Sequence, residues 1–224
     1  MPALLRIAGR YSCLVFLLLA LSGCVTYRAG LPGEWPELGK IELTDTPFFP
    51  QKAYQCGPAS LASLLQSSGI PVTPDQLTQQ VYLPQRQGSL QLDLVGATRR
   101  NGRIPYQLPP NIMAIRDELE QKHPVLVLQN LGLRNMPRMH YAVVTGISPS
   151  TDEIILHSGT RQNLSMDVNK FLRSWDLADR WAIVSLKPGE LPADNDPIRF
   201  IKAVADYAIV TKDAAVLKLS LIHI

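Results

Sequence analysis

Residues 48–60 read FFPQKAYQCGPAS, and the architecture we expect is built outward from this segment. Leucines at helical spacing follow it, which predicts a helix over residues 59–67. Pro58 suits the first turn of that helix, because a proline there loses no hydrogen bond. Gly69 and the proline soon after it end the helix. Cys56 is therefore expected at, or one residue before, a helix N-terminus.

This position has chemical consequences for Cys56. The unpaired amides and the dipole of a helix N-terminus favour a thiolate over a thiol, so we expect a lowered pKa. A thiolate is the form that attacks a carbonyl carbon. Gln51 lies shortly before the cysteine, and its side-chain amide could donate a hydrogen bond to an oxyanion beside the sulfur.

Three pieces of sequence resemble the bacteriocin-processing (double-glycine) peptidase-like group of papain-type cysteine peptidases: Gln51, residues 56–61 (CGPASL) and residues 139–146 (MHYAVVTG). The resemblance covers roughly residues 48–186. It implies that Gln51, Cys56 and His140 are catalytic. It also implies a papain-like fold, and an Asp on the strand after His140 that orients the imidazole.

The chain departs from that family pattern at the orienting residue. If the hairpin after His140 is symmetric about residue 150, Thr160 lies opposite His140 and Ser158 lies diagonally on the same face. The family has Asp near this point, whereas residues 158–160 here are Ser-Gly-Thr. A hydroxyl can fix the imidazole tautomer but supplies no charge. We therefore predict Ser158 as the third catalytic residue, and three substitutes remain open: Asn130, Asn163 and Asp176.

The order of the elements predicts an α+β fold. Helical patterns come first, over residues 59–67, 73–82, 89–101 and 111–122, with Thr73, Ser89 and Asn111 as caps. Strand patterns follow at 125–128, 141–147, 153–156 and 181–186, with a short helix at 167–175. Helices before strands suggest a helical lobe that carries the cysteine, packed on an antiparallel sheet that carries the histidine.

Two other histidines are poorer candidates for the catalytic base. His157 should point to the sheet face opposite His140, because side chains alternate along a strand. His123 precedes a proline at a helix-to-strand junction, where a surface role is expected.

The N-terminus reads as a targeting segment. Arg6 and Arg10 precede an apolar core over residues 13–21, which is too short to span a bilayer comfortably. Residues 21–24 (LSGC) look like a bacterial lipobox, which predicts cleavage before Cys24 and lipid on its sulfur. An ordinary signal peptide and a membrane anchor are the alternatives. By analogy with the family, we expect the outer membrane, facing the periplasm.

The cysteine count fits this reading. With the signal removed and Cys24 acylated, Cys56 is the one remaining thiol of an exported protein and has no disulfide partner within the chain. The alternative is a small buried core residue.

The expected domain organisation follows from these segments: a signal peptide (1–23), a tether (24–46), a cysteine peptidase-like domain (47–187), a linker (188–197), the start of a truncated helical, tetratricopeptide-like region (198–218) and a probable artefact (219–224). The last six residues resemble a translated transposase mosaic end from sequencing libraries. An apolar stripe at helical spacing over 198–209 predicts the C-terminal helix.

The composition excludes several classes of function. The 224 residues carry a net charge of +3, without a basic patch that would suggest nucleic acid. Neither a metal-ligand cluster nor a phosphate-binding glycine loop is present, so we expect no cofactor. The expected partners are a peptide or protein substrate, the membrane through the N-terminal lipid, and a protein partner through the C-terminal helices. Three functions remain possible: a cysteine peptidase, an acyltransferase or amidase with the same Cys-His pair, and a catalytically inactive binding module.

Overall fold

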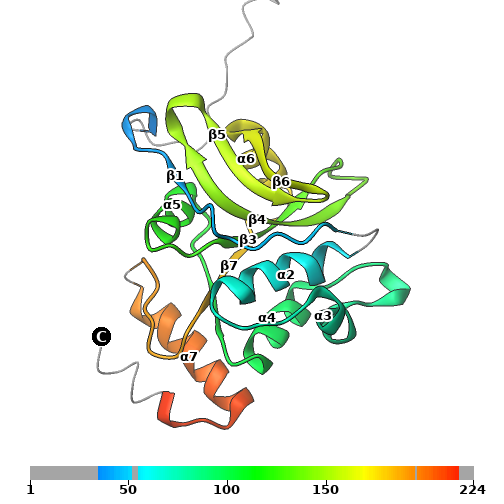
Figure 1. Ribbon diagram of the computed structural model, residues 1–224, viewed down its shortest axis with the longest axis vertical. Helices are drawn as coiled ribbons and strands as arrows, with labels where there is room; N and C mark the ends of the chain where they lie inside the picture. Colours follow the sequence, from blue (N-terminus) through cyan, green and yellow to red (C-terminus); the bar gives the residue numbers. More distant parts are fainter. Residues whose placement is uncertain (1–34, 52–54, 195, 217–224) are drawn as a thin grey trace, which may run out of the picture.

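The computed structural model describes residues 35–51, 55–194 and 196–216 (Figure 1). The predicted signal peptide, the lipid-attachment residue Cys24 and residues 219–224 lie outside this part of the chain. Among the described residues, no helix is both long and apolar enough to cross a membrane.

The described residues form one antiparallel sheet with the strand order β2-β7-β3-β4-β5-β6, and β1 pairs with β4. The strands are β1 (Ile41–Glu42), β2 (Ile104–Gln107), β3 (Val125–Asn130), β4 (Met139–Ser148), β5 (Glu153–Ser158), β6 (Arg161–Asp167) and β7 (Ala182–Leu186). The four predicted strands are confirmed as β3, β4, β5 and β7. Strands β2 and β6 were not predicted.

The helices also follow the predicted order. They are α2 (Cys56–Ser67), α3 (Pro74–Val81), α4 (Gln91–Arg100), α5 (Ile112–Glu120), α6 (Val168–Asp176) and α7 (Pro197–Thr211). Thr73 caps α3 in a capping box with Gln76, and the Asn111 side chain accepts from the Ala114 N–H, so both predicted caps are confirmed. The predicted cap at Ser89 is wrong, because Leu90 occupies that position and makes no side-chain cap.

The sheet separates two hydrophobic cores, as the alternation of side chains along its strands requires. On β3, Val125 and Val127 belong to one core, and Leu126 and Leu128 belong to the other. The core that contains Leu126 is closed by α2, α3 and α4, which lie together below the curled strands in Figure 1. The other core is closed by α5, α6 and α7. This is the predicted α+β, papain-like arrangement of a helical lobe against a sheet.

The β4–β5 hairpin has the predicted register where it approaches the site. Val143 pairs with His157 and Val144 with Leu156, which is the register of a hairpin symmetric about residue 150. Between Val144 and Gly146 the register shifts by a β-bulge. A Cβ on Gly146 would lie 2.6 Å from the Ile41 carbonyl oxygen, so this residue lets β1 approach β4 closely.

Candidate active site

A cavity of about 740 Å³ opens where the N-terminus of α2 meets the start of β4. It is lined by Gln51, Cys56, Arg86, Gln87, Gly88, Ser89, Leu90, Arg138, Met139, His140, Tyr141 and Gly159. The sequence-predicted residues Gln51, Cys56 and His140 therefore share one cavity, and its volume is typical of a ligand site.

Cys56 is the first residue of α2 and is half-buried. Its sulfur accepts hydrogen bonds from the backbone N–H groups of Tyr141 and Gly57, which brings it beside the residue that follows His140. Burial raises the pKa of the Cys56 thiol above its ordinary value, and these N–H groups lower it by less. The expectation of a lowered pKa is therefore wrong, because desolvation of a thiolate outweighs the help it receives at the helix end.

His140 projects from β4 toward Ser158 of β5. The distance from His140 Nε2 to Ser158 Oγ is 2.9 Å, so the two side chains are hydrogen-bonded on one face of the hairpin, as the predicted register requires. Burial, and then the charge of Arg138, hold the pKa of His140 below its ordinary value. If Nε2 donates to Ser158, Nδ1 is left without a proton and can accept one from a thiol.

The three alternatives to Ser158 that the sequence left open have other partners in the structure. The Asn130 side chain accepts from the backbone N–H groups of Gly132 and Arg138 and shapes the β3–β4 loop. Asp176 is paired with Arg180. The Asn163 backbone N–H donates to Nδ1 of His157, and Nε2 of His157 donates to the Thr46 carbonyl. The buried His157 ring thus has a hydrogen bond at each nitrogen, neither of them with His140.

Gln51 is fixed at the edge of the cavity. Its backbone N–H donates to the Gly159 carbonyl, 3.0 Å away, at the turn that follows Ser158. Its side-chain amide donates to Ser60 Oγ at 3.2 Å and to the Tyr141 carbonyl at 3.4 Å. Both protons of Nε2 are thus engaged, and one of these long contacts must be given up before the amide can donate to a bound oxyanion.

A family model, described as the peptidase C39-like family, matches residues 43–183, which is more than half of the chain. The chain belongs to this family. It is similar to the crystal structure of a putative C39-like peptidase from Bacillus anthracis, with 16% identity and a TM-score of 0.55 over 67% of this chain and 98% of that one. It is also similar to the peptidase domain of Streptococcus ComA, a bi-functional ABC transporter involved in a quorum-sensing pathway.

For the ComA domain the identity is 22% and the TM-score 0.50, over 63% of this chain and 98% of that one. A search of curated proteins finds no match. The structural likenesses establish the fold, and the C39-like match agrees with the family that the residues around Cys56 and His140 resemble.

Three residues of this C39-like site were not foreseen. Arg86 and Arg138 line the cavity on two different segments, and Arg138 lowers the pKa of His140. Ser89 packs on the first turn of α2, and a Cβ on Gly57 would lie 2.4 Å from its hydroxyl oxygen. That oxygen is buried and has no hydrogen-bond partner among the described residues. Arg138 stands two positions before the histidine, which is the signal that could have revealed it.

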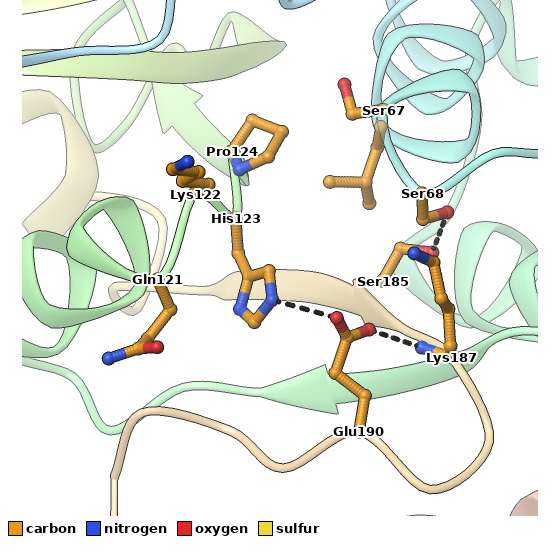
Figure 2. A pocket seen from close by; sticks show the side chains of 10 residues that line it. Ser67, Ser68, Gln121, Lys122, His123, Pro124, Ser185, Lys187 and Glu190 are labelled. Carbon is orange, nitrogen blue, oxygen red and sulfur yellow. Dashed lines mark hydrogen bonds and ion pairs between the residues drawn. The ribbon is translucent and has the colours of Figure 1, made fainter.

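A second, smaller cavity of about 220 Å³ lies at the other end of α2 (Figure 2). His123 lines it, with Nδ1 2.7 Å from Glu118 Oε2 and Nε2 3.3 Å from Glu190 Oε1. The predicted surface role of His123 is wrong, since its side chain is only 15% exposed and bonds to a Glu118 that is 1% exposed. In the described part of the chain, no His, Cys, Asp and Glu side chains form a group that could hold a metal ion.

Proposed function

We propose that this chain is a papain-type cysteine peptidase, anchored by lipid in the bacterial cell envelope, that acts on peptides. One observation carries the catalytic part. Cys56 begins α2 with its sulfur against the Tyr141 N–H, while the neighbouring His140 is hydrogen-bonded to Ser158 through Nε2. A nucleophile and a base therefore face one cavity, and the base is oriented by a third group.

The pair is neutral at rest in this proposal. Because the thiol pKa is raised and the imidazole pKa is lowered, Cys56 holds its proton and His140 holds none at Nδ1. As the sulfur attacks the peptide carbonyl carbon, the thiol proton passes to His140, which acts as a general base. The imidazolium then gives this proton to the leaving amine, and water hydrolyses the resulting thioester.

The oxyanion formed in this step needs donors beside the sulfur. The backbone N–H of Cys56 is one, because the first amides of a helix have no partner within the helix. The Gln51 amide is the second candidate, if it gives up its 3.4 Å contact with the Tyr141 carbonyl. The buried Ser60, whose hydroxyl donates to the same carbonyl, holds Gln51 close to this position.

The test is labelling with a thiol-directed peptidyl probe. The purified chain should be labelled at Cys56, and the Cys56→Ala variant should not be labelled there. If Cys56 in the wild-type chain takes no more probe than an unfolded control does, the peptidase proposal is wrong.

Two observations favour a second candidate, a peptidase fold that binds a peptide without cleaving it. No carboxylate reaches His140 among the described residues, and burial raises the pKa of the thiol. An acyltransferase or amidase would use the same Cys-His pair, and adding an amine acceptor to a peptide-cleavage assay would reveal acyl transfer as a product distinct from hydrolysis.

The anchoring part of the proposal rests on the sequence of residues 21–24. Lipid on Cys24 of an exported chain would place the domain at the outer membrane, facing the periplasm. Metabolic labelling with a fatty-acid analogue should mark the wild type and leave Cys24→Ala unmarked. Equal labelling of the two would contradict the anchor.

A protein partner at the C-terminal helices is the last part of the proposal. Helix α7 packs on β2, where Phe200 contacts Tyr106 edge-to-face at 6.3 Å. Its outer face exposes Ile198 and Ile209, at 80% and 76%. Such a face is suited to covering by another helix, as in a helical repeat.

A further inference from the structure

Among the described residues that line the cavity around Cys56, two side chains are cationic and none is a carboxylate. Arg86 comes from the loop between α3 and α4, and Arg138 from the start of β4, so they enter from different segments. The acid that acts electrostatically on Tyr141 is Asp93, which is not among the residues that line the cavity.

The side chains of these two arginines are unpaired, as are those of Arg100, Arg134, Arg161 and Arg173 in the described part of the chain. Neither Arg86 nor Arg138 has an acidic partner or a side-chain hydrogen bond among the described residues. By contrast, four arginines pair with carboxylates: Arg99, Arg116, Arg180 and Arg199. The cavity therefore presents two guanidinium groups whose planar donors are available to a bound anion.

The backbone at both arginines is held in place. The Arg138 N–H donates to Asn130 Oδ1 at 2.9 Å, and its carbonyl accepts from the Leu131 N–H. The Arg86 N–H donates to the Leu83 carbonyl at 3.0 Å, inside a loop that a Leu83–Gly88 bridge closes. The entropic cost of binding a ligand then comes mainly from ordering the two arginine side chains, because the backbone of these segments is already fixed.

Apolar side chains line the same cavity as the two arginines. Leu90 is 41% exposed and Met139 is 48% exposed, and both line the same cavity. We propose that this cavity selects peptides that carry a carboxylate side chain near the scissile bond, held by Arg86 and Arg138, with an apolar side chain against Leu90 and Met139. This inference rests on the proposed peptidase function and specifies its substrate class.

The expected size of the preference follows from the exposure of both arginines. Arg–carboxylate pairs are strengthened by bidentate geometry and weakened by solvent, so we expect about a three- to tenfold preference for an acidic peptide over its neutral isostere. Salt at about 0.5 M should reduce it, because exposed charges are screened.

Binding is measured first, independently of catalysis. The probe is a set of fluorescein-labelled octapeptide pools in which one position at a time is Glu, Gln or Lys, added to the Cys56→Ala chain and followed by fluorescence anisotropy. At one or more positions the Glu pool should bind about three- to tenfold more tightly than the Gln pool, and the Lys pool most weakly. This ratio should fall toward one when Arg86→Gln and Arg138→Gln are combined.

The matched control is Arg173→Gln. Arg173 is exposed on α6, which packs on the sheet face opposite α2, so the Glu preference should be unchanged. Equal binding of Glu and Gln pools at every position would overturn the proposal. So would a Glu preference that survives loss of both arginines.

Probe labelling of Cys56 separates the two proposals. If Cys56 reacts but the peptide pools show no Glu preference, the substrate class is wrong and the peptidase stands. If the Glu preference depends on Arg86 and Arg138 but Cys56 does not react, the charge recognition stands and the domain is a peptide-binding module.

Discussion

The two ends of helix α2 hold two histidines in opposite states. At the N-terminus, His140 is bonded to a hydroxyl, and burial with the Arg138 charge lowers its pKa. At the C-terminal end, burial lowers the pKa of His123, but Glu118 and Glu190 together raise it above its ordinary value of 6.5. Both ring nitrogens of His123 face carboxylates, which favours the imidazolium, because both nitrogens then donate.

This difference separates the proposed catalytic site from a structural one. His123 ties the end of α5 to the segment after β7. Glu118 also accepts from the Ala193 N–H. Glu190 accepts from the Lys187 N–H (Figure 2). With both nitrogens engaged by carboxylates, it has no free position for proton transfer. Among the described residues, the His140 ring has one hydrogen-bond partner, the Ser158 hydroxyl, and it lines an open cavity, so one nitrogen stays free to take a proton.

The largest expected effect is on turnover. His140→Ala should lower kcat/KM for a cleaved peptide by about 10³-fold or more, because the base is lost. His123→Gln, at the other end of α2, should leave kcat/KM within about twofold at a temperature where both variants are folded. Steady-state kinetics on both variants measures this, and a similar loss in the two would remove the distinction between the two ends.

The next effect is on stability. His123→Gln should lower the free energy of unfolding by about 2–3 kcal/mol, because Glu118 loses its charged partner while buried. Since the folded pKa of His123 is raised, its contribution is complete below the unfolded pKa near 6.5 and is lost as pH rises through the folded pKa. Urea unfolding between about pH 5.5 and pH 9 should show the difference shrink with rising pH.

His140 should have the opposite slope. Its folded pKa is lowered, so the unfolded state binds more protons and the wild type loses stability as pH falls through the His140 range. His140→Ala should therefore flatten the acid side of the stability curve. A His140→Ala curve that runs parallel to the wild type would contradict the lowered pKa.

The smallest effect concerns the partner of His140. Ser158→Ala should reduce kcat/KM about tenfold, near the 1.4 kcal/mol of one hydrogen bond. Ser158→Asp supplies a charge, should raise the pKa of His140 and should raise turnover where the carboxylate fits. Thr160→Ala, on the same turn, is the control. No change in Ser158→Ala would show that Ser158 does not orient the ring.

The structural features that depend on a local sequence pattern could be predicted from the sequence. The helix after Cys56, the caps at Thr73 and Asn111, and the hairpin register that joins His140 to Ser158 follow from spacing and from the two-residue period of a strand. Strand β6 was missed because it is a largely exposed edge with polar side chains and no apolar pattern.

The charge states were not predictable in the same way. The raised thiol pKa of Cys56 comes from burial by segments distant in the sequence, and the Glu190 that bonds His123 lies 67 residues away. Strand β2 was missed for a related reason. Strand β2 contains Pro105, which lowers strand propensity. The sheet accommodates this proline because β2 is an edge strand.

We propose that Cys56 and His140 form a working pair that is neutral at rest. The most direct test is the rate of Cys56 alkylation by iodoacetamide from about pH 5 to pH 10, followed by mass spectrometry of the Cys56 peptide in wild type and His140→Ala. The account predicts that the rate rises with an inflection above the ordinary thiol pKa of about 8.5, with little change in His140→Ala. A fast plateau that extends below about pH 6 in the wild type and disappears in His140→Ala would show a thiolate–imidazolium pair and contradict the account.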